Sequence, residues 1–69
     1  MTIELSTGDE FIAYESDAAP SVGTVLFFPM GRSFEVLSVT HRIEKLQTAT
    51  RSRPIMHRLS LIQCEVKEF

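Results

Sequence analysis

The fold is decided by the stretch SFEVLSVTHRI at residues 33–43, followed by LQTATRSRP at 46–54 and IMHRLSLIQCEV at 55–66. The first and third segments are rich in β-branched and other apolar residues, which favour strands. The middle segment is polar, contains small residues and ends at a proline, which is typical of a loop. The sequence therefore predicts a long antiparallel hairpin that turns within residues 46–54.

The apolar residues of the two strands predict their register. If the hairpin is centred on Ala49, apolar residues face each other across the strands, as stabilising cross-strand pairs do. The same register places His41 opposite His57. The predicted apolar pairs are Phe34–Cys64, Val36–Ile62, Leu37–Leu61, Val39–Leu59 and Ile43–Ile55.

The buried face changes sides along this hairpin. Near the loop the apolar set contains Leu37, Val39 and Leu59, whereas beyond Leu37 it passes to Phe34 and Val36 on the opposite face. A flat hairpin cannot bury both sets against one core, but a bent or bulged one can. We therefore expect a bend near Leu37 and Leu61–Ile62, as in a small barrel.

A tight turn precedes the hairpin. Phe28-Pro29-Met30-Gly31 has proline second and glycine fourth, the pattern of a type I turn closed by a left-handed glycine. Residues 25–28 then form a strand in which Leu26 pairs with Phe34.

The N-terminal third contains two further short strands, at residues 2–5 and 10–14. They are predicted to pair Leu5 with Phe11 and Ile3 with Ala13. A short helix at residues 9–18 is the alternative, because Thr7-Gly8-Asp9-Glu10 has the spacing of a capping box. The prediction is thus an all-β domain of about five strands, with α+β as the alternative.

The barrel-forming residues resemble those of a known group of proteins. Pro20-x-x-Gly23, an apolar strand, a tight turn and Phe34-x-Val36-x-x-Val39-x-His41-x-Ile43 are similar to small bacterial and phage SH3-like barrel proteins of unassigned function. The resemblance covers residues 20–66. It implies a small antiparallel SH3-like barrel or strongly coiled meander, and a phage or mobile-element accessory protein that acts by binding.

Length and composition indicate one domain, residues 1–69. The longest apolar stretch, Val25 to Phe28, is far shorter than the roughly 20 residues of a membrane-spanning helix. The acidic N-terminus lacks the basic start of a signal peptide, so we expect a cytoplasmic protein. A single cysteine, Cys64, cannot form an internal disulfide and is expected to be a buried small apolar residue.

Charge is distributed unevenly along the chain. The net charge is −2, but residues 1–31 contain five acidic and no basic side chains. Residues 32–58 contain six basic and two acidic ones. An acidic face and a basic face can therefore coexist on one small domain.

Three groups of residues are candidates for function. The basic group on the hairpin and its loop is the first: Arg42, Lys45, Arg51, Arg53 and Arg58. The second is an apolar patch, or else a strand buried on both faces of a closed barrel, at Val25, Phe27 and Met30. The third is the pair His41 and His57, whose joint protonation would weaken stability in acid if the pair is buried.

No motif indicates catalysis. The sequence contains no nucleophile elbow, phosphate-binding glycine loop or cluster of metal ligands, so we expect neither an enzyme nor a bound metal or cofactor. The leading hypothesis is a small protein-interaction module, for example a phage or mobile-element inhibitor or adaptor that binds a host protein. The alternatives are RNA or single-stranded DNA binding through the basic 42–58 hairpin loop, and a structural subunit or self-assembling dimer.

Overall fold

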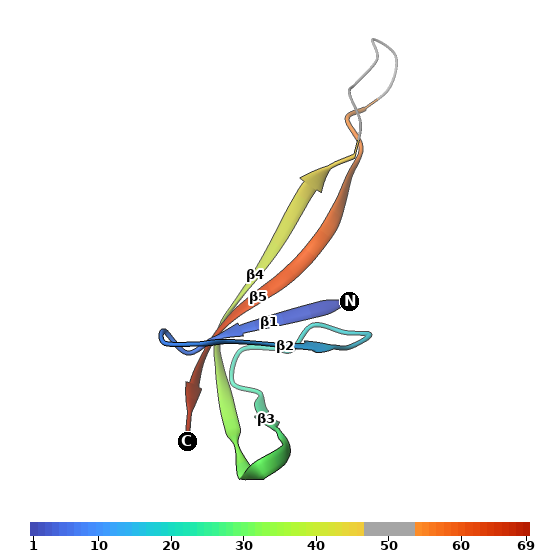
Figure 1. Cartoon of the computed structure of the whole chain (residues 1–69). Helices are drawn as coiled ribbons and strands as arrows, with labels where there is room; N and C mark the ends of the chain where they lie inside the picture. The colour runs from blue at the N-terminus through green and yellow to red at the C-terminus, as the bar shows by residue number, and fades with distance from the viewer. Residues whose placement is uncertain (47–53) are drawn as a thin grey trace.

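The computed structural model describes residues 1–46 and 54–69. They form one curled five-stranded sheet, a half-barrel with strand order β2-β1-β5-β4-β3 (Figure 1). The predicted all-β fold is confirmed, and the alternative of a helix at residues 9–18 is wrong. The elements are β1 Thr2–Ser6, β2 Phe11–Glu15, β3 Val25–Phe27, the 3-10 turn η1 Pro29–Gly31, β4 Ser33–Lys45 and β5 His57–Glu68.

One strand pair departs from the predicted antiparallel pattern. β1 lies parallel to β5, with Ile3 beside Ile62 and Leu5 beside Cys64. The other three pairs are antiparallel. The sheet is therefore mixed, and its central strands come from opposite ends of the chain.

The core lies on the inner face of the curled sheet. Alternation along β1, β4 and β5 points its side chains to that face. Cys64 is buried as predicted, and this burial raises the pKa of its thiol. The buried residues are Ile3, Leu5, Phe34, Val36, Ile62, Cys64 and Val66.

Two bulges let the long strands follow this core. The extra residue in β4 lies between Val36 and Ser38, where the buried positions change phase from Val36 to Val39. The extra residue in β5 is Ser60, which separates Leu59 from the buried Ile62. The bend predicted near Leu37 is confirmed, and the second irregularity lies next to the predicted Leu61–Ile62 position.

The predicted β4–β5 register is wrong. That register placed the two phase changes opposite each other, whereas the bulges are offset along the hairpin. Outside the two bulges each β4 residue faces a partner four residues further along β5 than expected, and between the bulges the shift is five residues. The observed pairs include Val36–Val66, Val39–Cys64, His41–Ile62, Ile43–Leu59 and Lys45–His57.

The predicted register of the first hairpin is shifted by one residue. Leu5 faces Ile12 and Ile3 faces Tyr14, while Phe11 faces Ser6 and is exposed. The turn closes where the Thr7 N–H donates to the Glu10 carbonyl at 3.2 Å. Gly8 lies inside this turn at φ 98, a conformation that glycine adopts without strain.

The turn after β3 differs from the expected type. The predicted Leu26–Phe34 pair is confirmed, and the Phe28 N–H donates to the Arg32 carbonyl at 2.7 Å. Gly31 is left-handed at φ 74, as expected, but Met30 is left-handed too, at φ 68. Met30 has its side chain almost fully in solvent, so packing does not offset this strain.

Replacing Met30 with glycine is expected to raise the free energy of unfolding by about 0.5 kcal/mol. The substitution removes the steric cost of a left-handed L-residue but adds flexibility to the unfolded chain. Urea denaturation followed by circular dichroism measures the change. Gly31→Ala, which places a Cβ at the other left-handed position, should shift the midpoint in the opposite direction. Equal shifts for both variants would contradict this account.

Candidate functional site

A two-stranded arm extends from the sheet. In the described part of the chain, β4 beyond His41 and β5 before Ile62 pair only with each other. We call residues 42–46 and 54–61 the arm, and residues 1–41 and 62–69 the body. The arm projects away from the body (Figure 1), and the principal extents are 53 × 21 × 19 Å. The radius of gyration is 15.3 Å, against about 11 Å for a compact chain of this length.

The arm exposes large apolar side chains. Leu59 and Leu61 are half-buried, and four others are exposed by 46–58%. A two-stranded ribbon has no third layer against which these side chains could pack, and such ribbons are marginally stable alone. The exposed residues are Ile43, Leu46, Ile55 and Met56.

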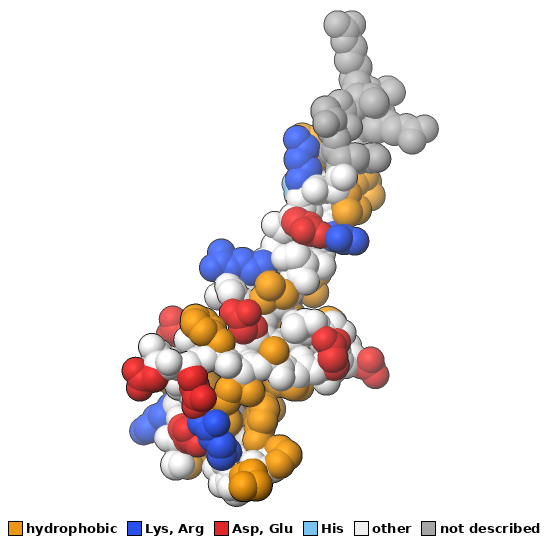
Figure 2. Space-filling model, viewed as in Figure 1, with side chains coloured by type: hydrophobic (Ala, Val, Ile, Leu, Met, Phe, Trp, Pro, Cys, Tyr) orange, Lys and Arg blue, Asp and Glu red, His pale blue; other side chains and the backbone are white. Residues whose placement is uncertain are grey.

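The basic group predicted from the sequence lies partly on this arm. Arg58 forms an ion pair with Glu44 across the ribbon, and Arg42 donates to the Gln63 side chain at 2.5 Å. Lys45 makes no ion pair with the described residues. Arg51 and Arg53 lie outside the described residues. Figure 2 shows basic side chains along the arm and acidic ones mainly over the body.

The predicted apolar patch is exposed rather than buried on both faces. Phe27 is 84% and Met30 is 96% exposed, and Val25 is exposed beside them. The patch lies at the β3 end of the molecule, opposite the arm (Figure 1). The two predicted surfaces are therefore separate. An apolar pocket of about 270 Å³ borders the patch and is lined by Tyr14, Leu26, Phe27, Phe28 and Pro29.

The predicted histidine pair does not form. His41 faces Ile62 and His57 faces Lys45, because the register differs from the expected one. Both side chains are exposed, and His57 Nδ1 lies 3.0 Å from the Ile55 carbonyl oxygen. The prediction of a pH-sensitive pair is therefore wrong.

Sequence reasoning missed a polar surface on the outer face of the sheet. Arg42, Gln63 and Glu4 form a hydrogen-bonded row there, in which Gln63 donates to Glu4 at 2.9 Å. Phe11 is 74% exposed at its edge. The alternation of apolar and polar residues in FIAYE at 11–15 is a signal for this surface. It was not recognised because the predicted β1–β2 register was wrong by one residue. A pocket of about 200 Å³ in this face is lined by Glu4, Ser6, Phe11, Ser38, Thr40, Arg42, Gln63, Cys64 and Glu65.

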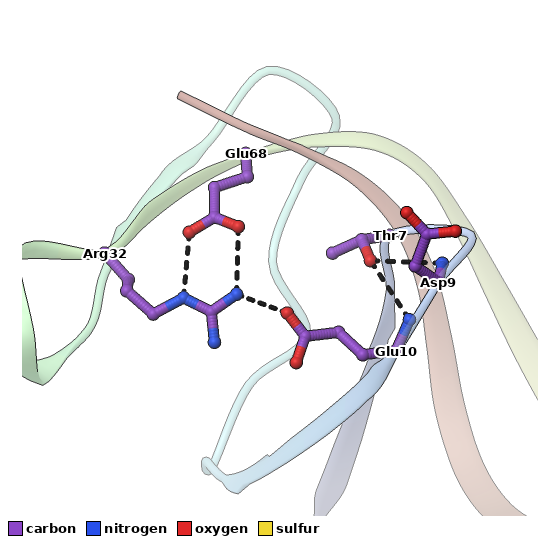
Figure 3. A network of polar contacts seen from close by, with 5 residues as sticks. All are labelled: Thr7, Asp9, Glu10, Arg32 and Glu68. Atoms are coloured by element: carbon purple, nitrogen blue, oxygen red, sulfur yellow. Dashed lines mark hydrogen bonds and ion pairs between the residues drawn. The ribbon is translucent and has the colours of Figure 1, made fainter.

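Arg32 forms ion pairs with two carboxylates of the body. Its guanidinium donates twice to the Glu68 carboxylate, at 2.8 and 2.9 Å, and also to Glu10 (Figure 3). The Thr7 hydroxyl accepts from the backbone N–H groups of Asp9 and Glu10 in the adjoining turn. These contacts join the start of β2, the start of β4 and the end of β5. Arg32 therefore has a structural role.

This ion pair changes the titration of its members. The hydrogen bond to Glu68, followed by that to Glu10, raises the pKa of Arg32 above its ordinary value. The hydrogen bond from Arg32 holds the pKa of Glu68 below its ordinary value of 4.5. The folded state therefore favours the ionised Glu68 carboxylate.

Glu68→Gln is expected to lower the midpoint of urea unfolding slightly in neutral buffer. Because the folded pKa of Glu68 lies below the unfolded one, its contribution is complete above the unfolded pKa and is lost as pH falls through the folded pKa. The midpoints of variant and wild type should therefore converge in strong acid. The effect is small because the pair is solvent-exposed. Glu65→Gln is the control, and a similar pH dependence for it would contradict the assignment to Arg32.

Two further features are absent from residues 1–46 and 54–69. These residues contain no group of three or more His, Cys, Asp or Glu side chains placed to hold a metal ion. They also contain no helix of the length and apolar character needed to span a bilayer. Comparison of the chain with protein-family models, with curated proteins and with solved structures found no match in any of the three.

Proposed function

We propose that this chain is a protein-interaction module whose arm makes the contact with a protein partner. One observation carries the proposal: the arm leaves the body as a two-stranded ribbon that exposes Ile43, Leu46, Ile55 and Met56. Exposed apolar side chains gathered on one element are typical of interaction sites. A partner would supply the missing layer against which these side chains could pack.

The charges beside these apolar residues favour an acidic protein surface as the partner. Arg42 and Lys45 flank Ile43 along β4 and are exposed. Apolar anchors ringed by charged side chains are the usual anatomy of a protein interface. A module of this kind occupies a surface of its partner, which is how an inhibitor or adaptor of the kind implied by the resemblance would act.

Nucleic-acid binding through the same cations is the second candidate, supported by the concentration of basic side chains on the arm. Residues 35–68 contain no Phe, Tyr or Trp on which a base could stack, and Arg58 is paired with Glu44. The protein partner is therefore the preferred proposal. Titration with single-stranded RNA and DNA at several salt concentrations tests the alternative, because phosphate contacts make affinity fall steeply with salt.

A photo-crosslinking residue at position 43 tests the proposal. Irradiation in a nuclease-treated lysate of the cells that make the protein should give discrete protein adducts. The same residue at Val22, which is exposed on the body, is the matched control and should give none of these adducts. Identical adducts from both positions, or none from position 43, would count against the arm as the binding surface.

A further inference from the structure

We infer that the partner of the arm is a second copy of this chain, whose outer sheet face receives it. This inference rests on the proposed function and adds the identity of the partner. Two arms would be exchanged about a two-fold axis, so each chain would donate its arm and receive the other.

The first argument is the separation of charge. The arm contains three basic side chains and one acidic one, while the body contains two basic and eight acidic ones. The arm is therefore positive and the body negative. Such a molecule is electrostatically complementary to itself when arm meets body, whereas contact between two arms would be repulsive.

The second argument is the character of the outer face. The strand registers place Glu4, Glu15, Glu35 and Glu65 on this face, together with the basic residues Lys67 and Arg42, of which Arg42 donates to Gln63. No described element covers it, and it holds the pocket of about 200 Å³ that Glu4 and Glu65 help to line. Phe11 provides an exposed apolar contact at its edge. The face therefore offers carboxylates and an apolar anchor to an arm that carries cations and apolar side chains.

Only the base of the arm contacts the body of its own chain, where Arg42 donates to Gln63 and Leu59 packs against the core. The rest of the arm continues β4 and β5 in a direction away from the body (Figure 1). Its apolar side chains Ile43, Leu46, Ile55 and Met56 therefore stay exposed in the single chain.

Sedimentation equilibrium of the purified protein over a range of concentrations tests the inference. The wild type should form dimers, and dimerisation should weaken as salt rises from about 0.1 to 1 M, because the Debye length falls from about 10 to 3 Å. A protein that stays monomeric at every concentration would overturn the inference, while adducts from position 43 with another protein would leave the proposed function standing.

Charge reversal locates the two surfaces. Arg42→Glu with Lys45→Glu reverses the arm, and Glu15→Lys with Glu65→Lys reverses the outer face. Each double variant alone should dimerise more than about tenfold more weakly, because attractive contacts become repulsive. An equimolar mixture should recover a heterodimer. Thermal unfolding of each variant checks that it is folded.

A matched control separates the outer face from net charge. Asp9→Lys with Asp17→Lys changes the charge by the same amount, but at turn residues outside the strands of that face. This variant should dimerise nearly as well as the wild type. The inference would be overturned if the mixture of the arm variant and the outer-face variant formed no heterodimer. It would also be overturned if the control variant lost as much dimer affinity as the outer-face variant.

Discussion

Phe34→Ala is expected to unfold most of the protein at room temperature. Phe34 is fully buried at the centre of the core, where the Phe28 ring packs against it edge-on with ring centroids 5.4 Å apart. The Arg32 guanidinium lies 5.2 Å from the ring centroid. Truncation of a buried phenylalanine to alanine costs about 3–5 kcal/mol, which is as much as a domain of this size commonly has.

The matched control is Phe27→Ala, the same chemical change at a side chain that is 84% exposed. It should leave the urea midpoint nearly unchanged. Circular dichroism and urea denaturation of both variants measure the difference. Similar midpoints for the two would show that Phe34 does not carry the core.

Removal of the arm is expected to abolish partner binding while the body stays folded. In this variant an Asn-Gly turn replaces residues 43–60 and joins Arg42 to Leu61, which face each other across the hairpin. All seven buried core residues lie outside the deleted segment. The variant should therefore unfold cooperatively, with a smaller dependence on denaturant because less surface is exposed on unfolding.

Binding by the shortened variant is measured by sedimentation equilibrium and by competition with the position 43 crosslink. It should neither self-associate nor reduce the crosslinking of the full chain. If the shortened variant still binds, the binding site lies at the Phe27 patch or on another part of the body, and not on the arm.

Local patterns predicted the strands and turns well. The tight turn at Pro29 and Gly31 brought Leu26 opposite Phe34 as expected, because few residues separate the two strands and little freedom remains in their register. The phase change of apolar residues near Leu37 likewise predicted a bulge that the structure contains. These features depend on neighbouring residues only.

Registers of the longer elements could not be predicted in the same way. A shift of four residues keeps each side chain of the hairpin on the same face, and the two offset bulges add a fifth residue only between them. Several registers therefore pair apolar with apolar residues equally well. The contact of β1 with β5 decides among them by adding Ile3 and Leu5 to the core.

The outer face was missed for the same reason. An expected pair of Leu5 with Phe11 assigned Phe11 to the core, whereas the turn at Gly8 moves it by one position and turns it outward. Ile43 and Ile55 were expected to pair on the apolar face, because the sequence does not reveal that β1 reaches only to the level of Ile62.

The parallel pairing of β1 with β5 has a consequence for how the chain folds during synthesis. Ile3 and Leu5 pack beside Ile62 and Cys64, so the core cannot close until both β1 and β5 have been synthesised. Contacts between such distant parts of a chain carry a large loop-closure cost and slow the search for the native state. The nascent chain should thus acquire its stable structure only after β5 has left the ribosome, and a ribosome that stops before β5 would release a product that cannot form this core.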